Sequence, residues 1–251
     1  MDSYMALAPY YDRFVGADYD RIIAFICARL ESYCNEPSLI CDIGCGSGTI
    51  SLALLKKGYD MIGVDGSYEM LNEALMKRDS MDGGERALFL CQELPDFELY
   101  GTVDAIISTL DTVNYITDDQ DLDRLFYWFR NYLNPDGLLI FDINSLYKYT
   151  SVLDNNCDVY EDDNVFLTWR SRFDGIYCDH ALTIFEKDED CYFRSDEEQK
   201  QRYYSIDEIK ALLEKYQFDL LEIKDDYSER EPFENSARLT FVARVRKEFA
   251  E

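Results

Sequence analysis

Hydrophobic residues follow two spacings along the first 145 residues of the chain. They recur at the intervals of three and four typical of an amphipathic helix over Asp18–Tyr33, Thr49–Lys57 and Leu122–Leu133. Between these helices lie short continuous apolar runs, which are typical of buried strands: Ser38–Ile43, Met61–Val64, Leu88–Cys91, Val103–Thr109 and Leu138–Ile143. Because short strands alternate with helices, the pattern predicts a doubly wound α/β fold, in which helices cover both faces of a parallel sheet.

Polar residues predict where several of these elements begin. Ser67 is a typical N-cap residue, and the helix after it has an apolar face of Met70, Leu71, Ala74 and Leu75. The segment Asn134–Gly137 is rich in turn-forming residues, so we expect a turn before the last strand of this part of the chain.

The alternation of strands and helices stops after Asn144. Three strand-like segments follow, at Val165–Arg172, Gly175–Phe185 and Tyr192–Tyr204, and the Asp-Gly pair at 174–175 predicts a hairpin turn. From residue 154 to 198 there are 14 acidic and 4 basic side chains. The pattern predicts an antiparallel β insertion over residues 146–204. It could be a surface ornament, but ligands bind at the carboxyl ends of parallel strands, which favours a substrate lid.

The alternating pattern resumes after the insertion. Ser205 and Glu208 have the spacing of a capping box and predict a helix. Two more strands, Asp219–Lys224 and Arg238–Arg246, are expected to pair antiparallel at one edge of the sheet. The predicted core domain therefore consists of residues 1–145 and 205–251.

Composition narrows the class of partner. The chain has 251 residues, of which 47% are hydrophobic, enough for a substantial buried core. Its formal net charge is −26, and a surface so negative repels phosphate backbones and anionic lipids. We therefore expect no nucleic-acid or membrane partner. A neutral or cationic small molecule is easier to accept.

The cysteines and the single histidine indicate a reduced environment without a metal site. Eight cysteines occur, none of them in a C-x-x-C pair, and His180 is the one histidine. A Cys/His zinc site has almost no nitrogen ligand to use, so no metal is expected. No secretory signal sequence is recognisable at the N-terminus and no apolar run reaches the roughly 20 residues of a membrane span. These features predict a cytoplasmic protein with mostly buried thiols.

A glycine-rich turn after the first strand is the clearest chemical signal. Three alternate glycines follow Asp42 in the segment 42–48, where a strand runs into a helix. Tight strand–helix turns also use glycine for structural reasons alone. However, Asp65 ends the second strand 23 residues after Asp42, where a carboxylate can accept both ribose hydroxyls. The loop and the acid together predict a site for an adenosine cofactor.

The loop differs from two common nucleotide-binding motifs. The dinucleotide fingerprint needs a third glycine at the position of Thr49, and no lysine follows the loop as a P-loop requires. The acidic Asp42 before the first glycine disfavours a pyrophosphate and tolerates an amine. These departures favour a cationic adenosyl sulfonium over a dinucleotide.

The segments Asp42–Gly48 and Val64–Leu71 resemble the class I S-adenosylmethionine-dependent methyltransferases. The chain is most similar to their small-molecule branch, which includes nucleotide-sugar and glycine-type N-methyltransferases. Tyr4 and the segment Tyr10–Asp12 resemble the N-terminal lid of that branch. The resemblance implies a Rossmann-like, seven-stranded, mostly parallel sheet with an antiparallel β-sheet insertion after the fifth strand. It also implies S-adenosylmethionine as methyl donor and S-adenosylhomocysteine as product.

The resemblance assigns roles to individual residues. The loop Gly44–Cys45–Gly46 would pass the methionine part of the cofactor, with Asp42 near its amine. Asp65 would hold the ribose, and Met70 would lie against the adenine unless it is an ordinary core residue. The remaining cofactor contacts it implies are Gln92 and Glu93 at the adenine amino group, where the family usually has Asp, Leu110 near the sulfonium, and Tyr11 closing over that end.

Catalysis in this family needs little from the protein, because the sulfonium methyl is already activated and orientation supplies most of the rate. Nucleotide-sugar enzymes often have a histidine just after the fourth strand, where this chain has Tyr115. Tyr115 is therefore the candidate for orienting an amine or accepting a proton through water. His180 is expected to be a surface or structural residue.

The sequence thus predicts transfer of a methyl group from S-adenosylmethionine to a small-molecule acceptor, with an amine favoured over oxygen or carbon. Two alternatives stay open. The first is a catalytically silent protein that binds S-adenosylmethionine or S-adenosylhomocysteine. The second is a nicotinamide-dependent oxidoreductase, which Thr49 disfavours. A homodimer is also left open.

Overall fold

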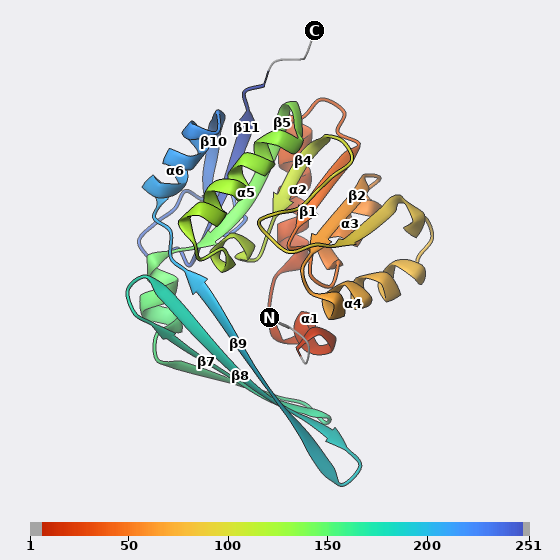
Figure 1. The fold of residues 1–251 in the computed structure, drawn as a ribbon, viewed down its shortest axis with the longest axis vertical. Helices are drawn as coiled ribbons and strands as arrows, with labels where there is room; N and C mark the ends of the chain where they lie inside the picture. The colour runs from red at the N-terminus through yellow and green to blue at the C-terminus, as the bar shows by residue number, and fades with distance from the viewer. Residues whose placement is uncertain (1–6, 248–251) are drawn as a thin grey trace.

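The computed structural model describes residues 7–247, and its main feature is a seven-stranded sheet (Figure 1). The strand order is β10-β11-β5-β4-β1-β2-β3. The strands are β1 (Leu39–Ile43), β2 (Asp60–Asp65), β3 (Ala87–Cys91), β4 (Val103–Ser108), β5 (Leu133–Asn144), β10 (Phe218–Asp225) and β11 (Arg238–Val245). Among these described strands, β11 runs antiparallel to both neighbours and the rest run parallel. The predicted doubly wound, mostly parallel sheet with an antiparallel edge pair is confirmed.

Helices cover both faces of this sheet. They are α2 (Tyr19–Tyr33), α3 (Thr49–Lys56), α4 (Tyr68–Asp79), α5 (Asp119–Tyr132) and α6 (Ile206–Lys215). One buried cluster packs Phe126 and Phe129 of α5 with Ile209 of α6 against the sheet. A second, on the opposite face, contains Leu30 of α2 and Leu54 of α3. The apolar helical stripes in the sequence therefore face the two sides of one sheet.

The predicted caps are present. The Ser67 hydroxyl accepts a hydrogen bond from the Met70 N–H at 3.2 Å and begins α4. Ser205 and Glu208 form the reciprocal capping box that begins α6. Each cap satisfies backbone N–H groups that the first turn of a helix leaves without a partner.

The predicted turn at Asn134–Gly137 is wrong, because these residues belong to β5. The strand begins at Leu133, which pairs with Val103, whereas the next pair joins Leu138 to Ala105. The extra residues form a bulge in which Asp136 has a φ of 59°. Turn-forming residues thus bend a strand here without ending it.

The insertion forms a second, four-stranded antiparallel sheet, called sheet B below. Its order is β6-β7-β8-β9, with bounds β6 (Asn156–Glu161), β7 (Val165–Phe173), β8 (Tyr177–Asp188) and β9 (Cys191–Arg202). The predicted hairpin turn joins β7 to β8. Strand β6 was not predicted, because it is a half-exposed edge strand with charged residues and no apolar run. A short π-helix, η4 (Lys148–Leu153), leads into the sheet.

Sheet B extends from the body as a long twisted ribbon, and β9 leads back to α6 (Figure 1). Its far half carries an apolar inner face that packs against Leu7 and Phe14 of the N-terminal segment, through Val165, Leu167, Leu182 and Ile184. That segment contains the short helices η1 (Ala8–Tyr10) and α1 (Tyr11–Phe14). The N-terminal segment is thereby held between sheet B and the body.

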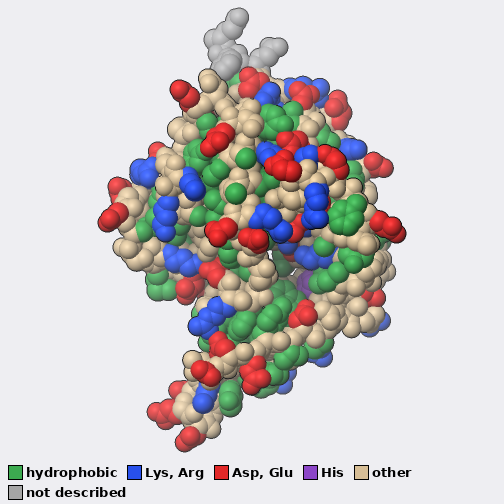
Figure 2. All heavy atoms as spheres, turned by 180° about the vertical axis from the view of Figure 1, so that it is seen from behind, with side chains coloured by type: hydrophobic (Ala, Val, Ile, Leu, Met, Phe, Trp, Pro, Cys, Tyr) green, Lys and Arg blue, Asp and Glu red, His purple; other side chains and the backbone are tan. Residues whose placement is uncertain are grey.

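The described residues hold eight free cysteines, and three of them are exposed, so the thiols are less buried than expected. No helix within residues 7–247 is long and apolar enough to cross a membrane. The same residues contain no cluster of three metal-ligating side chains. On the face shown in Figure 2, acidic and basic side chains are interspersed, and a hollow separates the body from sheet B.

Candidate functional site

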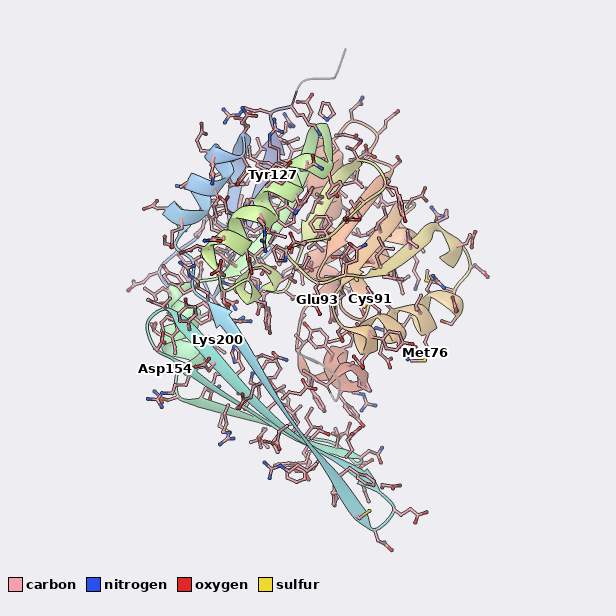
Figure 3. All side chains as sticks on the ribbon, in the orientation of Figure 1. Met76, Cys91, Glu93, Tyr127, Asp154 and Lys200 are labelled. Carbon is pink, nitrogen blue, oxygen red and sulfur yellow. The ribbon has the colours of Figure 1, made fainter. Side chains whose placement is uncertain are left out.

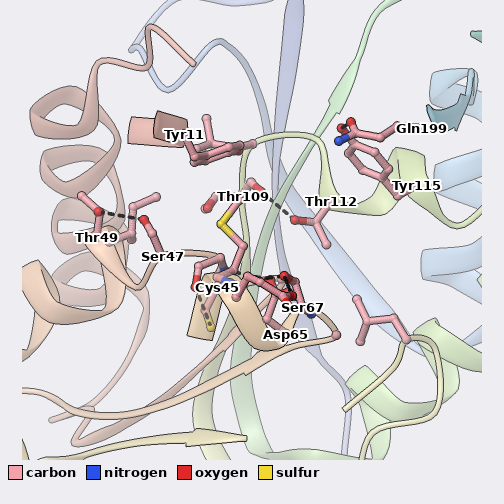
Figure 4. Close-up of a pocket in the computed structure, with 18 of the residues that line it drawn as sticks. Tyr11, Cys45, Ser47, Thr49, Asp65, Ser67, Thr109, Thr112, Tyr115 and Gln199 are labelled. Carbon is pink, nitrogen blue, oxygen red and sulfur yellow. Dashed lines mark hydrogen bonds between the residues drawn. The ribbon is translucent and has the colours of Figure 1, made fainter. Parts of the chain in front are cut away.

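A pocket of about 480 Å³ opens at the carboxyl ends of β1, β2 and β4, which is the usual ligand position in such sheets. Its walls come from the glycine-rich loop, the start of α4, the β4–η3 segment (η3, Thr112–Tyr115), the N-terminal segment and β9. Nine predicted site residues line it: Tyr11, Gly44, Cys45, Gly46, Asp65, Met70, Glu93, Leu110 and Tyr115. Figure 4 labels Tyr11, Cys45, Asp65 and Tyr115 among them. Figure 3 shows Glu93 and Lys200 on two sides of this pocket.

Two residues of the glycine-rich loop, Gly44 and Gly46, have a left-handed backbone conformation that favours glycine. Gly44 has a φ of 73°, and a Cβ there would collide with the side chain of Thr112. Gly46 has a φ of 52°, and a Cβ there would meet no atom of the described residues within 4 Å. The loop therefore presents bare backbone to the pocket at Gly46, as the close passage of a ligand requires.

Asp65 lies at the end of β2 with its carboxylate against the loop. One oxygen accepts the Gly46 N–H and the other accepts the Ser67 N–H, both at 2.8 Å. Burial raises the pKa of Asp65, and these two N–H groups oppose the shift. Each oxygen keeps a further lone pair, so the carboxylate can still accept hydrogen bonds from a ribose diol.

Two predicted residues lie outside the pocket lining. The side chain of Gln92 is bonded to the backbone of Glu98: Oε1 accepts the Glu98 N–H at 2.7 Å, and Nε2 donates to the Glu98 carbonyl at 3.2 Å. Asp42 is buried behind the loop, where Oδ2 accepts the Ser51 hydroxyl at 2.5 Å and Oδ1 has no partner among the described residues. Their predicted contacts with the cofactor stay predictions.

Burial raises the pKa of Asp42 from 3.8 to about 7. Between about pH 4 and 7 the Asp42 carboxyl is therefore protonated in the folded chain and ionised in the unfolded chain. The free energy of unfolding falls as pH rises through this range. We expect Asp42→Asn, which cannot ionise, to raise the melting temperature more at pH 8 than at pH 5. Asp82→Asn, at an exposed position, is the control. Equal differences at the two pH values would show that Asp42 is ionised throughout.

The turn after β4 has a strained backbone held by one buried carboxylate. Leu110 and Asp111 both have left-handed φ values, 56° and 60°. Both of their N–H groups donate to Asp142 at 2.7 Å, and Asp142 also accepts from Arg238 at 3.0 Å and from the Tyr227 hydroxyl. Asp142 is fully buried. This carboxylate fixes the part of the turn that lines the pocket.

Asp111 connects this turn to sheet B. Its carboxylate accepts from Arg238 at 2.7 Å and from Gln201 of β9 at 2.6 Å, with the Lys148 ammonium at 3.9 Å. Burial alone would raise the pKa of Asp111, but Lys148 and Arg238 outweigh it and lower the pKa. Asp111 and Asp142 thus pair with Lys148 and Arg238 where the body meets sheet B, and Asp226 lies 3.7 Å from Arg238 as a third carboxylate.

The N-terminal segment is fastened to the glycine-rich loop by Asp12. Its carboxylate accepts from Lys77 at 2.5 Å, Ser47 at 2.9 Å, Thr49 at 3.0 Å and the Tyr19 hydroxyl at 2.8 Å. This places Tyr11, the preceding residue, in the wall of the pocket (Figure 4). Tyr4, also expected in the lid, lies outside the described residues.

Tyr115 lies next to sheet B in the wall of the pocket. Its hydroxyl donates to Oε1 of Gln199 on β9 at 3.0 Å (Figure 4). His180, expected at the surface or in a structural role, is buried on the inner face of β8. Gln199, which lines the pocket, and Asp142, which holds the turn after β4, were not predicted as site residues. A lone acid in the apolar run 138–143 was a signal for Asp142, whereas alternating polar residues on a strand gave no signal for Gln199.

Comparison with known proteins identifies the family. A methyltransferase domain family matches residues 11–223. The Bacillus subtilis (strain 168) protein YqeM, provisionally named a methyltransferase, is 31% identical over 248 residues, covering 97% of this chain and 98% of its own. The crystal structure of an S-adenosylmethionine-dependent methyltransferase from Clostridium acetobutylicum ATCC 824 superposes with a TM-score of 0.87 at 32% identity, covering 96% and 98% of the two chains.

A more distant structure shares the fold. The sugar N-methyltransferase KedS8 from Streptoalloteichus sp ATCC 53650 has a TM-score of 0.79 at 21% identity, over 96% of this chain and 95% of its own. The pocket fits the family's cofactor, since bare loop backbone and the Asp65 carboxylate lie where the methionine and ribose parts are expected. The chain therefore belongs to the methyltransferase domain family and is an S-adenosylmethionine-dependent methyltransferase.

Proposed function

We propose that the protein methylates an amine nitrogen of a small molecule. The observation that carries this proposal is the charge of the whole pocket, its cofactor end included: it is lined by Asp65, Glu69, Glu93 and Glu198, and Lys200 is the one cation among the described lining residues. An acidic lining favours a cationic or neutral amine over a polyanion. Tyrosine rings at positions 11, 19, 68 and 115 add faces on which an ammonium can rest.

Two relatives support nitrogen as the acceptor atom. The glycine/sarcosine N-methyltransferase of Halorhodospira halochloris is 31% identical over 124 residues, which is 47% of this chain. The name of KedS8 also describes an N-methyltransferase. Our choice of nitrogen as the acceptor atom rests on these two names and on the charge of the pocket.

At the cofactor end, we propose that Asp65 holds the ribose hydroxyls while Gly46 gives room to the methionine part. Met70, Glu93 and Leu110 complete that wall. S-adenosylmethionine supplies a methyl group on a positively charged sulfur, already activated for transfer. The chain therefore needs to orient the acceptor and exclude water, which are the main sources of rate in such a reaction.

At the acceptor end, Tyr11 and Tyr115 face Gln199 of β9 (Figure 4). We infer that sheet B, from the predicted insertion over residues 146–204, is the lid that closes this end and contacts the acceptor. Tyr115 would orient the amine, because its hydroxyl is fixed by Gln199. The proposal makes Tyr115 a positioning residue with no obligatory role as a base.

Methyl transfer can be tested with labelled S-adenosylmethionine and pairs of amines and alcohols that share a carbon skeleton. We expect transfer to amines, detected by mass spectrometry. Tyr115→Phe should slow transfer about two- to tenfold, the value of one hydrogen bond, without changing cofactor affinity. Tyr68→Phe, in the same pocket, is the matched control.

The results separate the remaining possibilities. Transfer to the alcohol of a pair but not to its amine would overturn the choice of nitrogen. Binding of S-adenosylmethionine with no transfer to a broad panel would favour the catalytically silent alternative. An equal loss in Tyr115→Phe and Tyr68→Phe would remove the specific role of Tyr115.

A further inference from the structure

A row of polar side chains crosses the inner face of sheet B next to the pocket. Ser171 of β7 pairs in register with His180 of β8, which in turn pairs with Gln199 of β9. Residues opposite each other on neighbouring strands have Cβ atoms about 4.5–5.5 Å apart. All three side chains are buried, although the far half of the same face is apolar.

The contacts of His180 determine which ring nitrogen carries the proton. Nδ1 accepts the indole N–H of Trp169 at 3.1 Å and lies 2.8 Å from the Ser171 hydroxyl. An indole N–H can only donate, so Nδ1 is unprotonated and the proton of the neutral ring is on Nε2. Burial lowers the pKa of His180, and Asp111 and Gln201 oppose this only in part. The ring is therefore neutral, and its Nε2–H is a donor.

This donor has no hydrogen-bond partner among the described residues, although His180 is only 3% exposed. The amide oxygen of Gln201, beside it on β9, already accepts from Asn144 and Tyr149, both at 3.1 Å. The single histidine lies at the hollow between the body and sheet B (Figure 2). The Gln201 side chain is close enough to favour the charged ring, but no acceptor among the described residues meets Nε2–H at hydrogen-bond distance and angle, so this donor can bind an acceptor atom from outside the chain.

Gln199 provides a second donor of the same kind. Its oxygen accepts from Tyr115, whereas Nε2 has no partner among the described residues at 6% exposure. The side chain lines the pocket, and its amide end points into it (Figure 4). A buried donor without a partner destabilises the fold. Two such donors on one row indicate a position built for an acceptor atom.

The charges around the row indicate the kind of acceptor atom. On the body side, Asp111 and Asp142 pair with Lys148 and Arg238, and Asp226 also lies 3.7 Å from Arg238. On β9 the buried carboxylate of Glu197 accepts the Leu7 N–H at 3.2 Å. Lys200, the next basic residue on β9, lies 3.5 Å from Asp179 and over the ring of Tyr177. The position therefore has two neutral donors and no unbalanced cation, which suits a neutral oxygen better than a phosphate or carboxylate.

We propose that the methyl acceptor carries a neutral carbonyl oxygen, of an amide or ester, which binds between His180 Nε2–H and Gln199 Nε2–H. A carbonyl oxygen has two lone pairs and can accept both bonds. This inference rests on the proposed function, because it names the chemical class of the amine substrate. Sheet B would then select substrates that carry a neutral carbonyl oxygen.

The single histidine allows a direct test by nuclear magnetic resonance. Protein labelled with ¹⁵N-histidine and loaded with S-adenosylhomocysteine should show a neutral ring protonated at Nε2 at pH 8, where the lowered pKa leaves the ring uncharged. Titration with acetamide should shift the Nε2–H resonance, whereas ethylammonium should leave it unchanged. A ring protonated at Nδ1, no response to acetamide, or a response to acetate alone would overturn the proposal.

Variants test the second donor. Gln199→Leu should weaken acetamide binding about two- to tenfold, the value of one hydrogen bond, and Gln120→Leu on the exposed face of α5 should not. Equal affinities of the two variants would remove Gln199 from the site. If acetamide binds but no amine is methylated, the proposed function fails and the carbonyl site stands. If amines are methylated and acetamide does not bind, the reverse holds.

Discussion

Asp142→Ala is expected to lower the free energy of unfolding by about 3–5 kcal/mol, the range for removing one partner of a buried ion pair. The Asp142 carboxylate accepts the N–H groups of Leu110 and Asp111 and bonds Arg238 and Tyr227. Its loss leaves a buried guanidinium with one partner fewer and two strained residues without the bonds that hold them. Urea unfolding measures the effect.

Asp142→Asn and a substitution at an exposed position are the controls for this prediction. The amide keeps the size of the side chain and one acceptor oxygen, so we expect a smaller loss than with alanine. Asp207→Ala, at an exposed position in α6, should change stability by no more than about 0.5 kcal/mol. A loss below about 1 kcal/mol in Asp142→Ala would mean that other contacts hold the β4 turn.

Asp65→Ala is expected to weaken S-adenosylmethionine binding by about 1.5–3 kcal/mol, the range for hydrogen bonds to a charged group. This corresponds to roughly 10- to 150-fold in the dissociation constant. The variant loses the proposed acceptor of the ribose hydroxyls and also the two bonds by which Asp65 joins Gly46 to Ser67. Isothermal titration calorimetry measures the affinity.

Thermal melts without cofactor separate lost binding from lost folding in this variant. Glu69→Ala removes another acidic side chain from the same pocket and serves as the matched control. We expect it to bind the cofactor more tightly than Asp65→Ala does. A folded Asp65→Ala protein with unchanged affinity would refute the ribose assignment.

The sequence predicted the fold correctly where apolar residues mark buried positions. The strands of the parallel sheet appear as continuous apolar runs because both of their faces are covered by helices. Strand β6 was missed because an edge strand with half-exposed side chains carries no such run. The bulge in β5 was read as a turn, since the same residue types favour both and only the pairing with β4 distinguishes them.

The candidate site was predictable where one motif brings its own residues together. Gly44, Gly46 and Asp65 lie within two adjoining βα units, so their spacing along the chain places them at one sheet edge. Gln92 shows the limit of this reasoning, because its side chain bonds the backbone of Glu98 and lies outside the pocket lining. Spacing determines the position of the backbone, whereas local partners decide where a side chain points.

The sequence by itself therefore determined the fold class, because this depends on hydrophobic period, and its resemblance to a known family indicated the cofactor and the loop proposed to hold it, because those residues lie near each other in the chain. The tertiary structure alone decided which side chains meet at the proposed acceptor end. There Tyr115 meets Gln199, and Gln201 meets Asp111, across separations of 84 and 90 residues. Polar side chains on a strand carry no mark of burial in the sequence. Only the packing of sheet B against the body makes His180 and Gln199 buried donors.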